Sequence, residues 1–359
     1  MEADPITRAV RKAVMTKTCF FRIVAFAMAA VPSATFVQSA PAADSEEPAT
    51  ISAKEFLALG IDDQRTMLAQ AFERRLNDSK NISYEVVVTI CNHEYRDGKL
   101  GPVVWEGMKW GYRHWRLGDS YRVDVDAYGR PFTDTPQQYI SSGFDANEGR
   151  SIETIRGKGL KKPYARIDKI HSRTIVDNRY SYWLDGKPNG DAEHIIRCIV
   201  NHRDQLKFSA TESGAVDVVV MTLPWTPFGL PDAVGEWKLE LDSKKGFLPV
   251  HGIGSWERVG DNRRIYRRAE FIVGDSKLVS GVWMPTRLRE VIEASPIPGV
   301  VNVWETEVVR IEQGKVTPTD LVVSIDEGTT VIDSLKGGSY SADANGQPVG
   351  DRIRPFGGK

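Results

Sequence analysis

The sequence is poor in cysteine, with three in 359 residues. Only Cys91 and Cys198 lie beyond the first forty residues. Small domains held together by several disulfides are therefore excluded, because such domains are dense in cysteine. Two interpretations of the pair stay open. The two residues either form one disulfide in an oxidising compartment or remain two thiols that pack as small hydrophobic side chains.

An excess of charge of one sign is also absent. The chain has 47 basic and 48 acidic residues, which gives a net charge of −1. This balance gives no reason to expect a nucleic acid as partner. One local basic run, residues 156–162, is most simply a solvated loop. Its alternative interpretation is a patch that contacts anionic lipid or polymer.

Motifs for catalysis and for cofactors are missing. There is no G-x-S-x-G nucleophile elbow and no glycine-rich phosphate loop. We therefore predict that the protein is not an enzyme and has no cofactor. His194, Cys198 and His202 lie four residues apart in a helix expected over 191–206, so they share one face. The outer two would be about 12 Å apart along the helix axis, too far to bind one ion together, so we predict no metal site.

Long hydrophobic runs are lacking as well. Basic residues between Arg8 and Arg22 precede an apolar stretch at 23–31, and small residues follow up to Ala40-Pro41-Ala42. This order is typical of a secretory signal, and the stretch is shorter than the ~20 residues that span a bilayer. We predict that residues 1–42 are a signal peptide and that the protein is exported to the periplasm, the cell envelope or the medium. A retained membrane anchor is the alternative, and Met15 is a second candidate start.

Helical periodicity occurs in two places after a polar segment. Residues 43–60 are expected to be a flexible tether. Apolar residues then recur at spacings of three and four over 63–77, which predicts an amphipathic helix. The segment from Asp191 to Leu206 repeats this pattern and predicts a middle helix.

Most of the remaining chain alternates between apolar and polar residues, which indicates strands with one buried face. Trp237, Leu239 and Leu241 alternate with charged residues, for example. We predict about ten strands in a mainly β (α+β) fold. A curved antiparallel sheet, or half-barrel, would occupy 61–327 with both helices packed on it, and 328–359 would form a hairpin and a frayed tail. Residues 127–190 look less regular.

The segment from Leu223 to Pro231 is an apolar loop with three prolines. Its large side chains, Trp225, Phe228 and Leu230, are candidates for the rim of a ligand cavity. Such a loop could instead plug one end of the core, and the sequence leaves both interpretations open.

The order of these segments resembles the LolA/LolB-like superfamily of lipoprotein carriers. The resemblance includes the helix 63–77 leading into a strand at Ile82, and three later segments: Trp115–Asp124, Leu239–Pro249 and Gly281–Arg287. It implies a cavity for acyl chains between sheet and helices, a lipid or acylated lipoprotein as partner, and peripheral contact with a membrane. The expected function is an exported envelope protein that binds an apolar ligand. The alternative is a non-catalytic exported structural or interaction module with a packed core.

Overall fold

The computed structural model describes residues 51–129, 133–169, 199, 202–211, 217–225, 233–260, 263–293 and 299–356. All described residues belong to one compact unit, Asp44–Lys359. The signal peptide lies outside these residues and stays a prediction. In the part of the chain that is described, no helix has the length and apolar character needed to cross a membrane.

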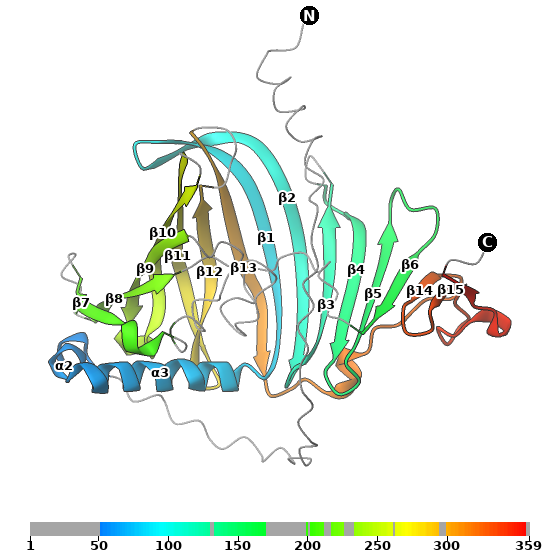
Figure 1. Ribbon diagram of the computed structural model, residues 1–359, viewed down its shortest axis with the longest axis horizontal. Helices are drawn as coiled ribbons and strands as arrows, with labels where there is room; N and C mark the ends of the chain where they lie inside the picture. The colour runs from blue at the N-terminus through cyan, green and yellow to red at the C-terminus, as the bar shows by residue number, and fades with distance from the viewer. Residues whose placement is uncertain are drawn as a thin grey trace, which may run out of the picture. The chain divides into compact units, whose positions relative to one another are not determined.

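Within this unit, the described residues form one large sheet of sixteen strands (Figure 1). The strands are β1 (Asn81–Arg96), β2 (Lys99–Leu117), β3 (Ser120–Tyr128), β4 (Pro136–Asp145), β5 (Arg150–Gly157), β6 (Tyr164–Asp168), β7 (Lys207–Ala210), β8 (Val218–Trp225), β9 (Ala233–Asp242), β10 (Leu248–Gly260), β11 (Arg263–Val279), β12 (Val282–Ile292), β13 (Val300–Gln313), β14 (Thr330–Asp333), β15 (Gly338–Ser341) and β16 (Arg354–Pro355). Their order across the sheet is β16-β15-β14-β6-β5-β4-β3-β2-β1-β13-β12-β11-β10-β9-β8-β7. Neighbouring strands run antiparallel except β14 and β6, which confirms the predicted mainly β class.

Alternation along the central strands gives the sheet two chemically different faces. On β1, Tyr84, Val86 and Val88 are buried, and the residues between them are more exposed. Directly paired residues on adjacent strands share a face. Val86 pairs with Tyr112 on β2 and with Val308 on β13, so apolar residues from three strands gather on one side. We call this side the apolar face and the other side the polar face.

Helix α3 (Ile61–Asp78) confirms the predicted amphipathic helix, within two residues at either end. Its buried residues Leu68 and Phe72 belong to one hydrophobic cluster with Met221, Leu239 and Phe271 of the sheet. The β8 to β12 half of the sheet is therefore covered by helix and closely packed.

Residues 52–60 differ from the predicted tether, because they contain helix α2 (Ala53–Ala58). Ser52 and Glu55 form a capping box: the Ser52 hydroxyl accepts from the Glu55 amide, and the Glu55 carboxylate accepts from the Ser52 amide. Phe56 is fully buried, and its ring lies 4.9 Å from that of Phe247. The cap and this anchor give the short segment a fixed structure.

The predicted middle helix lies mostly outside the described residues. Ile199 is helical and buried, and the described end of the segment is a 3-10 turn, η1 (Arg203–Gln205). The region 127–190, expected to be irregular, contains β4, β5 and β6. The predicted C-terminal hairpin forms as β14 and β15, and it joins the same sheet beside β6.

One connection crosses the sheet rather than turning back beside its own strand. Residues 314–329, which we call the strap, lead from β13 in the middle of the sheet to β14 beyond β6 (Figure 1). The strap contains the 3-10 turn η3 (Pro318–Leu321), which contacts β2, β3 and β4. It passes over the polar face, because Val323 covers the place where Gly143 would carry a side chain.

Candidate functional site

A row of large side chains follows β2 along the apolar face. Each lies opposite an apolar-face residue of β1, as the pairings Tyr112–Val86, Trp110–Val88 and Met108–Ile90 show. We call this row the β2 stripe; its members are Trp105, Met108, Trp110, Tyr112, His114 and Arg116.

The rings of the stripe contact one another and the next strand. The Trp110 ring centroid lies 6.1 Å from that of Tyr112 and 6.2 Å from that of Trp304 on β13. His114 is stacked on Tyr84 with centroids 4.7 Å apart, and its Nδ1 is 2.8 Å from the Tyr84 hydroxyl oxygen. The stripe therefore combines an aromatic middle with a polar end at His114.

Exposure changes along the β2 stripe. Tyr112 is fully buried and Trp110 is half-buried, whereas Met108 is 39% and Trp105 is 48% exposed. Further exposed apolar residues lie near the β1–β2 turn, among them Val103 and Val104. Clustered exposed apolar side chains are unusual on a monomeric protein and mark a contact surface. The stripe thus runs from a buried polar end to an exposed apolar end.

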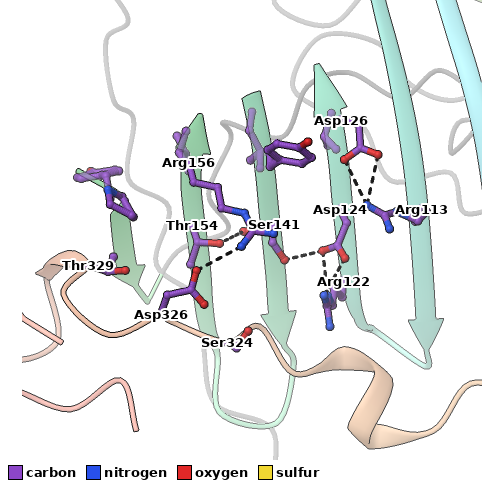
Figure 2. Close-up of a pocket in the computed structure, with 16 residues that line it drawn as sticks. Arg113, Arg122, Asp124, Asp126, Ser141, Thr154, Arg156, Ser324, Asp326 and Thr329 are labelled. Carbon is purple, nitrogen blue, oxygen red and sulfur yellow. Dashed lines mark hydrogen bonds and ion pairs between the residues drawn. The ribbon is translucent and has the colours of Figure 1, made fainter. Parts of the chain in front are cut away.

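A second candidate is a small pocket on the polar face, between β2–β6 and the strap (Figure 2). Its volume is about 90 Å³, below the ~300–1,000 Å³ of most ligand pockets. Its charged lining consists of three arginines and three aspartates: Arg113, Arg122, Arg156, Asp124, Asp126 and Asp326.

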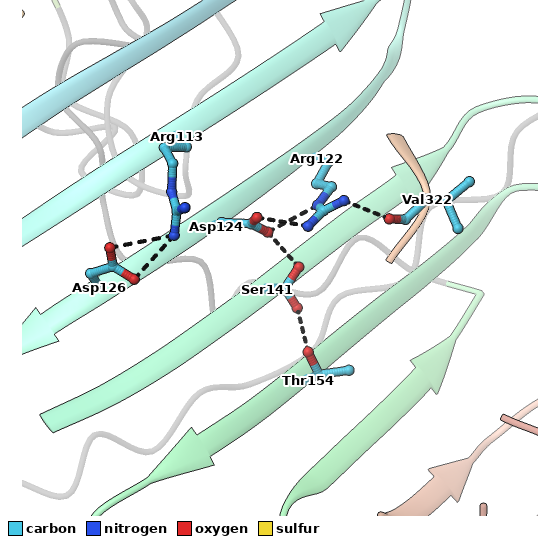
Figure 3. Close-up of polar contacts among 7 residues, drawn as sticks. All are labelled: Arg113, Arg122, Asp124, Asp126, Ser141, Thr154 and Val322. Carbon is cyan, nitrogen blue, oxygen red and sulfur yellow. Dashed lines mark hydrogen bonds and ion pairs between the residues drawn. The ribbon is translucent and has the colours of Figure 1, made fainter. Parts of the chain in front are cut away.

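The charges of this pocket compensate one another. Arg122 binds both carboxylate oxygens of Asp124, at 2.9 and 2.7 Å, and the Ser141 hydroxyl donates to the same carboxylate at 2.5 Å (Figure 3). Arg113 forms a similar pair with Asp126 at 3.2 Å. Balanced charge gives no net attraction for an anion, and the carboxylate that accepts from Ser141 is already paired with Arg122. This pocket attaches the strap to the sheet and is not the predicted apolar cavity.

Most site residues predicted from the sequence lie where the structure gives no side-chain description. Phe228, Leu230, His194 and Cys198 are outside the described residues, and of Trp225 only the backbone, at the end of β8, is described.

His202 precedes η1, and no cluster of three metal-ligating side chains occurs within the described ranges. The rim role of the loop therefore remains a prediction. The β2 stripe was missed, although its signal, the alternation Trp110-x-Tyr-x-His-x-Arg116, is present in the sequence.

Neither a protein-family model nor a curated protein matches this sequence. Among solved structures, a DUF1329 family protein from Desulfovibrio piger is 11% identical with a TM-score of 0.39, covering 74% of this chain and 100% of that one. A LolA superfamily protein from Nitrosomonas europaea is 12% identical with a TM-score of 0.36, covering 71% and 97%. MucB, solved in complex with MucA(peri), is 12% identical with a TM-score of 0.16, covering 67% and 93%. The superfamily expected from the sequence is thus represented among distant structural neighbours, and the function has to be argued from the site itself.

Proposed function

We propose that this is an exported envelope protein that binds an apolar ligand, a lipid or a lipoprotein acyl chain, along the β2 stripe. The observation that supports it best is the stripe itself, an aromatic row that emerges from the core and ends in exposed Met108 and Trp105. A protein whose core is fully packed would not need apolar side chains that continue from the core to an exposed surface.

The length of the stripe suits a membrane acyl chain. From Trp105 to Trp110, the part of the stripe that is not buried, the strand rises by about 17 Å at ~3.4 Å per residue. A bilayer core of about 30 Å holds two acyl chains end to end, so one chain needs roughly 15 Å. Each methylene group removed from water contributes about 0.8 kcal/mol. A chain lying on Met108 and Trp110 would therefore be held without any specific polar contact.

Trp110 and Trp115 allow a matched test. Both lie on β2, but Trp110 is on the apolar face, whereas Trp115 is on the polar face beneath the Arg122 guanidinium. We expect the wild-type protein to take up a fluorescent fatty acid. Trp110→Ala should weaken uptake about tenfold, which corresponds to a loss of about 1.4 kcal/mol. Trp115→Ala should bind like wild type. Equal binding by both variants, or no uptake by the wild type, contradicts the proposal.

The alternative, an interaction module with a packed core, is favoured by the helix-covered half of the sheet. There Phe56, Leu68 and Phe72 are fully buried in one hydrophobic cluster. Native mass spectrometry of protein purified from its own envelope separates the two functions. A bound lipid or acylated protein supports the carrier function. A clean apo mass together with no fatty-acid uptake leaves the exposed residues near the β1–β2 turn as the functional surface.

A further inference from the structure

Arg75 is a buried arginine on the sheet-facing side of helix α3. Its exposed fraction is 5%, and it follows Leu68 and Phe72 at helical spacings of seven and three. It lies seven residues after Leu68 of the helix-covered cluster and seven before Ile82, which belongs to the cluster of the β2 stripe. In the sequence, Arg75 thus lies between the residues of these two clusters.

The contacts of Arg75 use only part of its guanidinium group. Nη2 donates to the carbonyl oxygen of Gly246 at 3.4 Å, and the guanidinium carbon lies 5.2 Å from the centroid of the Phe72 ring. Nε and Nη1 have no hydrogen-bond partner among the described residues. No carboxylate in the described part of the chain forms an ion pair with it. The three N–H groups on these two nitrogens are therefore available.

Buried charges in proteins are normally paired and hydrogen-bonded, because they lose their hydration on burial. Burial lowers the pKa of Arg75 to about 10, so the group is still a cation at neutral pH. A purely structural role, holding the turn before β10 through Gly246, uses one N–H, and the ring of Phe72 interacts with the positive charge. That role leaves the remaining donors unexplained, and it provides no anion to neutralise the charge.

We propose that Arg75 binds the anionic group of the ligand, so that the ligand is an amphiphile with a carboxylate or a phosphate at one end. This rests on the proposed function, since it specifies the head group of the same apolar ligand. A guanidinium is well matched to the oxygens of either group. The aromatic stripe would contact the chain, and Arg75 would neutralise the head group.

Three probes with the same alkyl chain test this assignment: dodecanoate, dodecyl phosphate and 1-dodecanol. We expect the wild-type protein to bind at least one of the two anions ten times or more tighter than the alcohol. The tighter of the two anions identifies the natural head-group chemistry. Equal affinity for the alcohol and both anions overturns the assignment but leaves apolar binding intact. No binding of any probe contradicts the proposed function instead.

Variants of Arg75 show whether this residue causes the preference for the anion. Arg75→Met should abolish the preference for the anion while keeping alcohol binding, and Arg75→Lys should retain part of the preference. The matched control is Arg74→Met, which removes the same charge from the adjacent, half-exposed position that pairs with Asp78. A preference retained in Arg75→Met, or lost in Arg74→Met, overturns the proposal. The wild-type comparison remains decisive even where Arg75→Met does not fold.

Discussion

Arg122 on β3 donates a hydrogen bond from Nη1 to the carbonyl oxygen of Val322, 2.7 Å away, and so joins residues that are 200 positions apart in the chain. The same guanidinium binds Asp124 through its other nitrogens. Arg122 therefore connects the polar face of the sheet to the strap. The strap in turn leads to β14, which extends the sheet beyond β6.

Replacing Arg122 should loosen the strap. Arg122→Met removes a charge-assisted hydrogen bond to a backbone carbonyl, and we expect a loss of about 1–3 kcal/mol in the free energy of unfolding. Arg113→Met is the matched control, because Arg113 pairs with Asp126 on the same face and forms no hydrogen bond with the described residues of the strap. This variant should lose about 0–1 kcal/mol. Urea unfolding measures both losses. Hydrogen exchange at 318–325 should accelerate only in Arg122→Met, and equal effects of the two variants would contradict this role.

The sequence predicts the central strands well and β4 to β6 poorly, for a physical reason. On β1 every second residue is apolar, so the period of two is visible. On β4 and β5, polar residues lie on both faces: Ser141 faces the strap, whereas Ser142 and Glu153 are buried on the other side. Alternation is lost when both faces are polar. The strap and the parallel pairing of β14 with β6 depend on long-range contacts that no local pattern contains.

The candidate site shows the same limit. The alternation in 110–116 indicates a strand, and it also indicates which residues share a face. It does not say that Trp304, almost two hundred residues later, lies beside Trp110 on that face. The pairing of β1 with β13 brings the two rings together. For this reason the sequence favoured the conspicuous apolar loop 223–231 over the β2 stripe.

Glycine is required at position 254 because an aromatic ring occupies the space of a side chain. A Cβ on Gly254 would lie 2.6 Å from the ring of Trp237, its partner on β9. Gly254→Ala should therefore cost about 1–3 kcal/mol through overpacking and shift the tryptophan emission. Gly274→Ala on β11 is the control, since the nearest atom there, Cβ of Arg287, is 3.6 Å away. Thermal unfolding should separate the two variants, and an equal change in Tm would show that the ring is free to move.

Arg75 should make stability depend on alkaline pH. Its pKa is lowered to about 10 in the folded protein, because burial disfavours the charge. Below pH 10 both states are protonated, so the folded state carries the full cost, about 3 kcal/mol at 1.36 kcal/mol per pKa unit. From about pH 10 up to the higher, ordinary pKa of an arginine, the unfolded state binds more protons, so this cost is relieved as pH rises.

The variant Arg75→Met has no such cost, and it loses the bond to Gly246, worth about 1 kcal/mol. We expect ligand-free Arg75→Met to be about 1–3 kcal/mol more stable than wild type at pH 7.5. The difference should shrink at pH 11, where other groups titrate alike in both proteins. Urea unfolding at the two pH values measures it. If the difference in unfolding free energy is the same at both pH values, or if the variant is less stable at pH 7.5, then other interactions in the folded protein offset the cost of burying the guanidinium.

Cys91 on β1 should react slowly with thiol reagents. Burial raises the pKa of this thiol above its usual value of 9.0, with smaller contributions from Glu106 and Glu305, and the backbone of Gly107 opposes the shift. A raised pKa lowers the thiolate fraction at any given pH, and the thiolate is the reacting form. With the protein kept reduced, we expect iodoacetamide to alkylate Cys91 with a pH midpoint above 9. The variant Cys91→Ser shows which part of the labelling comes from Cys91 and which from Cys198. Fast labelling of Cys91 at pH 7 would refute the prediction. Omitting the reductant also tests the disulfide with Cys198, because a pair protects both thiols until they are reduced.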